Sequence, residues 1–309
     1  MLKGTIYKST GSWYKVKAEN GEFYNCKTRG KLRKQNIKST NPAAVGDIVE
    51  FEADIAAKTG QINNINDRKN YIIRKSSNLS KQSHIIAANV DQAIIMVSLT
   101  KPKTTSLFVD RFLVSNEAYS IPSIIIINKI DLYDNKLKKE HHQFVNIYKN
   151  AGYNCIETSV VNNTNLSKVK NIFQNKITVL AGNSGVGKSS LIKKIDPSIN
   201  LRIGEISDYH KSGKHTTTFS EMFEFVFGGK IIDTPGIKGY GLINFEKEEI
   251  YHFFPEIFEE AKHCKFHNCL HVKEPGCEVR NAVKNNKISL SRYNNYLSIL
   301  FDENSKYRV

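Results

Sequence analysis

The sequence has few cysteines, no long apolar run and no basic segment followed by an apolar stretch at its start. Its 309 residues include 5 cysteines, unevenly spread, which excludes a small secreted fold held by disulfides. Aliphatic runs such as Ile124 to Ile127 are far shorter than the roughly 20 residues of a membrane helix. Because 40% of the residues are hydrophobic, a disordered or collagen-like chain is also excluded. We expect a soluble cytoplasmic protein of two or three domains.

Positive charge is in excess and is unevenly distributed. The chain has 45 Lys+Arg against 30 Asp+Glu, a net charge of +15. Residues 1–75 hold 15 basic and 7 acidic residues, hence +8, whereas residues 246–309 hold 10 of each sign. A basic N-terminal region is typical of a domain that binds a polyanion. The alternative is a compositional bias, because the chain is rich in Asn, Lys and Ile throughout, and such a bias selects no partner.

Residues 2–66 predict a small β-barrel. Alternating apolar and polar residues bounded by Gly and Asn indicate strands near residues 4–7, 13–17, 22–24, 47–51 and 60–62. Five such strands fit an oligonucleotide-binding (OB-type) barrel, with a basic loop at 29–35. Trp13, Tyr14 and Tyr24 could stack on bases or fill the barrel's own core. Residues 68–81 are predicted to be a polar connector.

From Asp91 onward, aliphatic strands alternate with amphipathic helices. Strands are expected at 93–97, 124–127, 154–156 and 177–180, and helices at 106–119, 136–151 and 166–173. Such alternation predicts a parallel α/β sheet covered on both faces. After about residue 244 the chain becomes acidic and aromatic, then cysteine-rich, then helical. We therefore expect a multidomain chain with boundaries at 1–70, 71–245 and 246–309.

A glycine-rich loop follows the strand predicted at 177–180. It has the pattern G-x-x-x-x-G-K-S and leads into a predicted helix. Its glycines let backbone N–H groups surround phosphates, Lys188 reaches the β and γ phosphates, and Ser189 ligates Mg²⁺. The loop therefore predicts a nucleoside triphosphate site. The nucleotide-binding candidates here are Gly182, Asn183, Ser184, Gly185, Val186, Gly187, Lys188, Ser189 and Ser190.

The base is predicted from Asn128, Lys129, Ile130 and Asp131, which follow the strand at 124–127. The Asp131 carboxylate can accept both hydrogen bonds from guanine N1 and N2, while Asn128 braces the phosphate loop and Lys129 lies over the ring. Open parallel sheets bind ligands at the carboxyl ends of their strands, where this tetrapeptide lies. Ser159, after the next strand, is a further candidate guanine contact, although a helix-capping role fits it equally well.

Two further segments are candidates for sensing the γ-phosphate. Asp233 to Gly236 has the pattern D-x-x-G, in which Asp233 holds Mg²⁺ through water and the Gly236 N–H faces the γ-phosphate. Thr217, within residues 212–218, is a candidate for closing on Mg²⁺. Base-recognition segments thus precede the phosphate loop, which is a circular permutation of the usual GTPase order. This order is physically permissible because the pocket depends on spatial neighbours at one sheet edge.

The residue after Gly236 is Ile237, where many GTPases have the glutamine that orients the attacking water. Isoleucine cannot do this. We expect His215 to be catalytic, because a neutral imidazole can accept a hydrogen bond from water. The alternative is that His215 is a solvated loop residue and that a partner supplies catalysis.

The C-terminal cysteines predict a structural zinc site. Cys264, Cys269, His271 and Cys277 have the spacing C-x4-C-x-H-x5-C, and three thiolates with one imidazole form a closed tetrahedral set. Such a site contributes about 10 to 16 kcal/mol of apparent binding free energy. His263 and His267 are rival ligands that the spacing does not require. His141 and His142 are expected on an exposed helix face.

Together these motifs resemble the RsgA (YjeQ) family of circularly permuted GTPases that depend on the small ribosomal subunit, over nearly the whole chain. Residues 87–92, 274–276 and 291–300 add to the resemblance. It implies an N-terminal OB-type barrel, a central permuted P-loop GTPase and a helical zinc domain, with GTP or GDP, Mg²⁺ and one structural Zn²⁺ bound.

The resemblance also implies a GTP hydrolase acting late in maturation of the small (30S) ribosomal subunit. Hydrolysis would be stimulated by that subunit, contacts would be to its 16S rRNA, and turnover would be coupled to release. We expect a monomer with no membrane partner. Two alternatives are a permuted GTPase for large-subunit assembly and an rRNA-binding scaffold that holds GTP without significant turnover.

Overall fold

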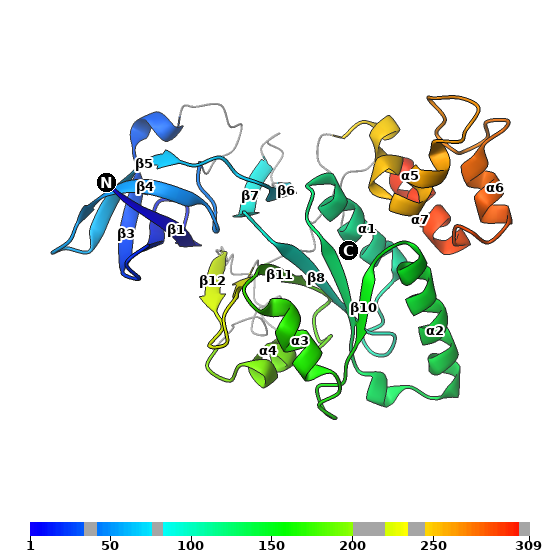
Figure 1. Ribbon diagram of the computed structural model, residues 1–309, viewed down its shortest axis with the longest axis horizontal. Helices are drawn as coiled ribbons and strands as arrows, with labels where there is room; N and C mark the ends of the chain where they lie inside the picture. The colour runs from blue at the N-terminus through cyan, green and yellow to red at the C-terminus, as the bar shows by residue number, and fades with distance from the viewer. Residues whose placement is uncertain (34–41, 76–82, 200–219, 234–244, 303–309) are drawn as a thin grey trace, which may run out of the picture.

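The computed structural model describes residues 1–33, 42–75, 83–199, 220–233 and 245–302. A β-barrel, a central α/β unit and a helical C-terminal unit follow one another along the molecule (Figure 1). Within the described residues, no helix has the length and apolar character needed to cross a membrane.

The N-terminal barrel has the five predicted strands. β1 pairs with β2, β2 with β3, β3 with β5 and β5 with β4, and β4 returns to β1 and closes the barrel. Tyr14 and Tyr24 are buried in its core, whereas the Trp13 side chain is 44% exposed. Tyr14 and Tyr24 therefore have the core role, whereas base stacking by Trp13 stays a prediction. The elements are β1 (Leu2–Ser9), β2 (Tyr14–Ala18), β3 (Phe23–Thr28), the 3₁₀ helix η1 (Gly30–Arg33), β4 (Ile48–Asp54) and β5 (Thr59–Ile65).

The central unit has a parallel sheet in the order β10-β9-β8-β11-β13, with β12 added antiparallel at the β13 edge. The strands are β8 (Gln92–Val97), β9 (Ser123–Ile127), β10 (Asn154–Glu157), β11 (Ile177–Ala181), β12 (Glu221–Glu224) and β13 (Lys230–Asp233). The helices are α1 (Ser106–Ala118), the 3₁₀ helix η2 (Ile130–Leu132), α2 (Asn135–Asn150), α3 (Leu166–Phe173) and α4 (Lys188–Ile195). The strands and helices that the sequence predicted thus lie where it placed them, whereas β12 and η2 were not predicted.

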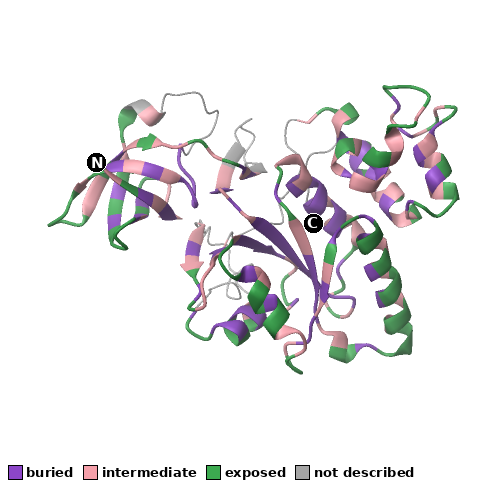
Figure 2. Cartoon of the chain, in the orientation of Figure 1, coloured by how far each residue is buried: buried purple, intermediate pink, exposed green. Residues whose placement is uncertain are grey.

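Helices cover both faces of this sheet. Ile95 and Val97 of β8 belong to the core that includes residues of α1 and α2. Ile94 and Met96 belong to the core formed with α3 and α4. Because side chains alternate along a strand, β8 is buried on both faces, as the continuous aliphatic run requires, and it is purple in Figure 2.

The barrel and the central sheet are joined by two connections. β12 pairs with β1, which makes one eleven-stranded sheet across both units. A hairpin of β6 (Tyr71–Lys75) and β7 (Ser83–Ala88) lies between them, and Ala87 of β7 bridges to Val45 of the barrel. The predicted polar connector at 68–81 is therefore wrong for residues 71–75, because Ile72 is buried in the central core.

The C-terminal unit is built from short helices. They are the 3₁₀ helix η5 (Lys247–Phe253), α5 (Pro255–Ala261), α6 (Glu278–Lys284) and α7 (Leu290–Leu300). Its core combines Phe254, Ile257 and Tyr296 with Val114 of α1. Helix α1 therefore contributes side chains to the apolar cores of both the central and the C-terminal units.

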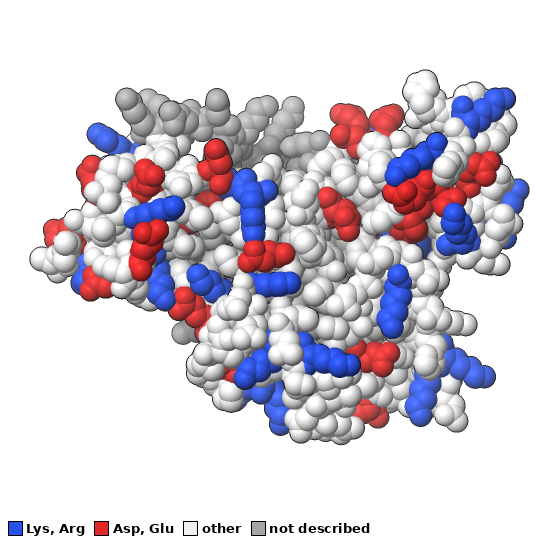
Figure 3. Space-filling model, in the orientation of Figure 1, with Lys and Arg blue, Asp and Glu red and all other residues white. Residues whose placement is uncertain are grey.

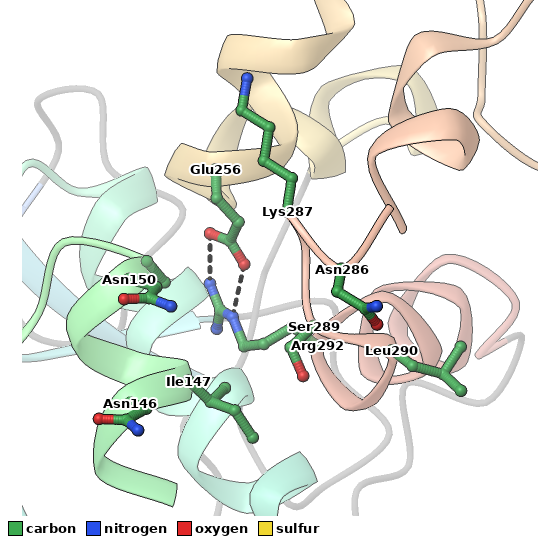
Figure 4. A pocket seen from close by; sticks show the side chains of 10 residues that line it. Asn146, Ile147, Asn150, Glu256, Asn286, Lys287, Ser289, Leu290 and Arg292 are labelled. Atoms are coloured by element: carbon green, nitrogen blue, oxygen red, sulfur yellow. Dashed lines mark hydrogen bonds and ion pairs between the residues drawn. The ribbon is translucent and has the colours of Figure 1, made fainter. Parts of the chain in front are cut away.

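A buried guanidinium joins the same two units. Arg292 of α7 is 1% exposed, and its Nη1 donates to Asp110 Oδ1 of α1 at 2.8 Å. Its Nε and Nη2 donate to the two carboxylate oxygens of Glu256 at 2.7 and 2.9 Å (Figure 4). A cavity of about 240 Å³ lies beside this cluster, between α2 and the start of α7.

The expectation for His141 was wrong. Its side chain is buried under the Tyr133 ring, at 5.4 Å between centroids, and its Nε2 lies 3.5 Å from Glu157 Oε1. The pKa of the His141 imidazole is lowered, because the effect of burial outweighs the opposing effect of the Glu157 carboxylate. His142, in contrast, is exposed as predicted. Both histidines lie in a hydrophilic stretch, so the sequence did not indicate that only His141 is buried against the sheet.

Candidate nucleotide pocket and metal centre

The phosphate loop connects β11 to α4 at the carboxyl edge of the sheet. Gly182 has φ 143° and a Cβ there would lie 2.3 Å from Met96 O. Gly187 has φ 107° and a Cβ would lie 2.5 Å from Asn128 Nδ2. Glycine is therefore required at both positions, by the backbone conformation and by space. Gly187 caps α4 without a side-chain hydrogen bond, and the N-terminus of such a helix favours an anion.

Lys188 folds back over the phosphate loop. Its Nζ donates to Gly182 O at 2.7 Å and to Asn183 O at 2.9 Å. The ammonium group of Lys188 therefore lies against the backbone of the predicted phosphate loop. Ser189 and Ser190 follow it on the first turn of α4, where Ser189 is half-buried and Ser190 exposed.

Asn128 connects the base-recognition segment to the phosphate loop. It follows β9, is 2% exposed, and its Nδ2 donates to Val186 O at 2.9 Å. Its Oδ1 accepts from the hydroxyl of Thr158 at 3.1 Å. Segments near positions 128, 158 and 186 are thereby joined side by side. Thr158 was missed by sequence analysis, where only Ser159 of the Glu157-Thr158-Ser159 triplet was singled out.

The remaining base-recognition residues lie on the same edge. Lys129 has φ 66°, and its Nζ donates to Lys101 O at 2.8 Å. Ile130 and Asp131 begin η2, and the Asp131 side chain is exposed and accessible to a ligand. Ser159 is buried and its Oγ accepts from Asn162 N at 3.1 Å. It caps a turn and not α3, whose N-cap is Asn165.

Asp233 ends β13, the strand beside β11. Burial raises the pKa of its carboxyl group to about 6, with Glu221 adding to the rise and Lys188 opposing it. A half-buried carboxylate in electrostatic contact with the phosphate-loop lysine is suited to a cation. The Asp233 carboxylate and the Ser189 hydroxyl are oxygen donors of the kind that Mg²⁺ takes.

Several predicted residues fall on segments 200–219 and 234–244. His215, Thr217 and Gly236 lie outside the described residues. Ile237 does as well.

The four predicted zinc ligands are brought together in the C-terminal unit. The ligand atoms of Cys264, Cys269, His271 and Cys277 all lie within 4.8 Å of one another. His271 Nδ1 is 3.6 Å from Cys264 Sγ and 3.5 Å from Cys277 Sγ. Three sulfur atoms and one ring nitrogen fit a tetrahedral Zn²⁺ ion. The rivals His263 and His267 are not in this group.

Burial in the cluster disfavours charged ligands without a cation. It raises the pKa of the Cys269 thiol to about 12 and lowers the pKa of His271 to about 4. Thiolates form readily here only when a positive ion compensates their charge. The donor set therefore fits a metal much better than it fits four free side chains.

Backbone contacts hold the loop that carries His271, whose φ is 59°. Glu274 accepts hydrogen bonds from the N–H groups of Leu270, Val272 and Lys273 at 2.8 to 2.9 Å. The hydroxyl groups of Tyr293 and Tyr296 donate to His271 O and Leu270 O. Sequence analysis cited Glu274 only for resemblance, because its supporting role depends on how the loop folds around it.

Comparisons with known proteins agree with this geometry. A family profile described as RsgA GTPase matches residues 65–243, and one described as RsgA N-terminal domain matches residues 3–62. The chain is 50% identical to the small ribosomal subunit biogenesis GTPase RsgA of Christiangramia forsetii, covering 100% of this chain and 98% of that protein. It is 52% identical to the protein of the same name from Phocaeicola vulgatus, covering 100% and 99%.

Two solved structures are also similar. The crystal structure of YjeQ from Thermotoga maritima superimposes with a TM-score of 0.80 at 35% identity, covering 97% of this chain and 98% of that one. The crystal structure of YloQ, described as a circularly permuted GTPase, gives a TM-score of 0.74 at 33% identity, covering 98% and 94%. The permuted segment order is therefore shared with solved proteins.

Proposed function

The chain belongs to the RsgA family of GTPases, and from this premise we propose that it hydrolyses GTP as a late maturation factor of the small ribosomal subunit. Binding to that subunit stimulates turnover, and hydrolysis is coupled to release. The relatives named above are small-subunit biogenesis GTPases, which favours this subunit over the large one. The GTPase family also argues against a scaffold without turnover.

The hydrogen bond from Asn128 Nδ2 to Val186 O carries the proposal. It joins the guanine segment to the phosphate loop, although 58 positions separate the two residues. Binding is proposed to proceed through the loop at 182–190, with Lys188 leaving Gly182 O and Asn183 O for the β and γ phosphates. Asp131 and Ser159 contact the guanine, and Lys129 lies over its ring. Ile130 lies beside the base.

Hydrolysis needs a water held in line with the γ-phosphate. We assign this role to His215, whose neutral imidazole would accept a hydrogen bond from the water. Thr217 is assigned to close on Mg²⁺, and the Gly236 N–H is assigned to sense the γ-phosphate. Mg²⁺, when bound, neutralises charge on the phosphates. Ser189 and Asp233 would hold it, Asp233 through water. His215→Ala should lower subunit-stimulated turnover, and a variant with wild-type stimulated turnover would assign catalysis to the partner.

The C-terminal cluster is proposed to bind one structural Zn²⁺ ion through Cys264, Cys269, His271 and Cys277. Its closed donor set leaves no coordination position for a substrate. The proposed divisions are 1–70 for the barrel, 71–245 for the GTPase domain and 246–309 for the zinc domain. A monomer in the cytoplasm is part of the proposal.

The barrel is proposed to contact the 16S rRNA. Lys27 Nζ lies 4.2 Å from the centroid of the exposed Trp13 ring, and Lys15 Nζ lies 4.5 Å from that of Phe23. Exposed rings with adjacent ammonium groups suit stacked bases and their phosphates. Figure 3 shows that basic side chains on this face are interspersed with acidic ones. Binding should therefore depend on particular contacts, and it should weaken steeply with salt.

Turnover measurements test the proposal. GTP hydrolysis is measured for the protein alone, with purified small subunits and with purified large subunits. We expect stimulation by small subunits only. Stimulation by large subunits would favour the other assembly pathway, and an absence of turnover in all three reactions would leave a GTP-binding scaffold.

Base recognition can be tested separately. In Asp131→Asn, the amide can no longer accept both guanine hydrogen bonds, so GTP affinity should fall by a factor of about 100 or more. An Asn amide can donate to the carbonyl of xanthine, so xanthosine triphosphate should bind the variant better than GTP does. Asp134→Asn, which alters the N-cap of α2, is the matched control. Equal GTP affinity for wild type and Asp131→Asn would contradict the assignment.

A further inference from the structure

Strand β12 lies between the barrel and the nucleotide pocket, and the contacts described so far do not assign it a function. It pairs with β13 on one edge and with β1 on the other. It is also the strand that follows segment 200–219 and precedes β13, which ends at Asp233. Figure 1 shows it (yellow) beside the blue barrel.

The barrel holds β12 from both faces of the sheet. On one face, Lys8 Nζ pairs with Glu221 Oε2 at 2.7 Å. Glu224 lies three positions along the strand and so projects from the other face. There it accepts from Lys17 Nζ at 2.6 Å and from the Tyr7 hydroxyl. Tyr7 is buried with Met222 of β12 in one core cluster.

One of these contacts continues to the nucleotide pocket. Lys8 is paired directly with Glu221, and Glu221 is paired directly with Asp233. Directly opposite residues in an antiparallel ladder project to the same face. Lys8, Glu221 and Asp233 therefore form one row from the barrel to the proposed Mg²⁺ side of the pocket. A displacement of β12 relative to the barrel moves the ladder partner of Asp233.

The other contact continues to the barrel surface. The Tyr7 ring lies edge-on to Phe23, with 5.4 Å between centroids, and Phe23 is 39% exposed. Lys17 Nζ lies 5.7 Å from the Phe23 centroid, and Lys15 Nζ lies over the same ring. A base stacked on Phe23 would place its phosphates near Lys17, in competition with the Glu224 carboxylate.

We propose that β12 couples the barrel's ligand to GTP hydrolysis. A single-stranded RNA segment bound at Lys15, Lys17 and Phe23 breaks the Lys17–Glu224 ion pair, because its phosphates compete for the Lys17 ammonium group. The barrel then holds β12 less tightly. Glu221 and Glu224 are thus positioning residues that act on Asp233 through the sheet. The inference rests on the proposed function, because it requires RNA on the barrel and GTP in the pocket.

Coupling of two ligands is reciprocal, so it is measured most cleanly as binding. The affinity of the full chain for purified small subunits, and for a short fluorescein-labelled oligouridylate, is measured with GDP and with a non-hydrolysable GTP analogue. We expect the two nucleotide states of the wild type to differ in affinity by about fivefold or more. In Glu224→Gln the two states should agree within about twofold.

Glu22→Gln is the matched control. Glu22 also accepts from one lysine and one tyrosine, Lys58 at 2.6 Å and Tyr24 at 2.8 Å, but within the barrel alone. It should keep the nucleotide dependence of the wild type, although freeing Lys58 raises its overall RNA affinity. Glu221→Gln is a second test variant and should also reduce the dependence. Thermal unfolding verifies that each variant is folded.

The possible outcomes separate the two proposals. If the wild type binds neither small subunits nor RNA, the proposed function fails and the coupling fails with it. If binding and stimulated turnover are present but affinity is equal in both nucleotide states, only the coupling is overturned. It is also overturned if Glu224→Gln keeps the nucleotide dependence, or if Glu22→Gln loses it to the same extent.

Discussion

The two junctions of the central GTPase unit differ in how they hold their neighbours. At the C-terminal junction, Arg292 is buried between Asp110 and Glu256, and α1 shares an apolar core with the C-terminal unit. At the barrel junction, the Lys8–Glu221 and Lys17–Glu224 pairs are partly exposed, with side-chain exposures between 25 and 42%. The ion pairs of the first junction are desolvated, whereas those of the second, where Tyr7 and Val45 also enter the central apolar core, are weakened by water and salt.

This difference assigns different mechanical roles to the two ends of the chain. Breaking a buried ion pair costs about 3 to 5 kcal/mol, whereas an exposed pair contributes about 0 to 1 kcal/mol. The C-terminal unit should therefore move with the GTPase unit as one body. The exposed ion pairs of the barrel junction can be exchanged at low cost, which is what a ligand-dependent junction requires.

The largest effect is expected from loss of the proposed zinc ion in the C-terminal unit. In Cys277→Ser, or after chelation, the C-terminal unit loses about 10 to 16 kcal/mol of apparent metal-binding free energy and should unfold. Zinc content and far-UV circular dichroism measure the loss. The single tryptophan, Trp13, lies in the barrel, so its fluorescence transition should stay unchanged. Cys155→Ala, outside the cluster, is the control, and equal loss of zinc there would contradict the assignment.

Arg292→Met should give the next largest effect. It leaves Asp110 and Glu256 buried without their guanidinium, which should lower the free energy of unfolding by about 3 to 5 kcal/mol. Denaturant titration measures the change. Lys262→Met breaks an exposed pair with Glu259 in the same unit and should cost less than about 1 kcal/mol. Similar costs for both variants would show that the buried Arg292 cluster is no stronger than an exposed ion pair.

Asp233 is the ladder partner of Glu221 at the barrel junction and provides a pH test. Its pKa is raised to about 6, so the native state holds this proton more tightly than the unfolded state does. Ionisation above about pH 6 therefore costs stability, and Asp233→Asn should stabilise the nucleotide-free protein there by about 2 kcal/mol. This gain in stability should vanish as the pH falls below the ordinary pKa of an aspartate side chain. Affinity for Mg²⁺·GTP should fall in the wild type below about pH 6, and a flat profile would contradict this.

The smallest effect is expected at the barrel junction. Burial opposes ionisation of Glu224, but hydrogen bonds from Lys17 and Tyr7 outweigh it and lower the pKa of the carboxyl group. The resulting stabilisation is present above the ordinary glutamate pKa and is lost as pH falls through the lowered value. Because the side chain is 42% exposed, Glu224→Gln should cost less than about 1 kcal/mol in thermal unfolding at neutral pH. A cost of several kcal/mol would show that this junction is as rigid as the other.

Much of the fold was predictable because its elements have local patterns. Alternation predicted the barrel strands, and the aliphatic runs predicted a sheet buried on both faces. The errors occurred where burial depends on distant residues. His141 is covered by Tyr133 and the end of β10, and Ile72 enters the central core from a segment that looks polar. Neither environment can be deduced from neighbours in the chain.

By itself, the sequence determined the candidate chemistry of the pocket and of the metal cluster. A phosphate loop needs glycines, a lysine and a serine at fixed spacing, and a zinc site of this kind needs cysteine and histidine within a short loop. Both patterns therefore lie within short segments of the sequence and can be recognised there. Only the tertiary structure decided how the units are joined. Arg292 and Asp110 are 182 positions apart, and Lys17 and Glu224 are 207 apart. Each of these residues is ordinary in its local sequence, and only folding, through burial or strand pairing, gives the pair its energy and its role.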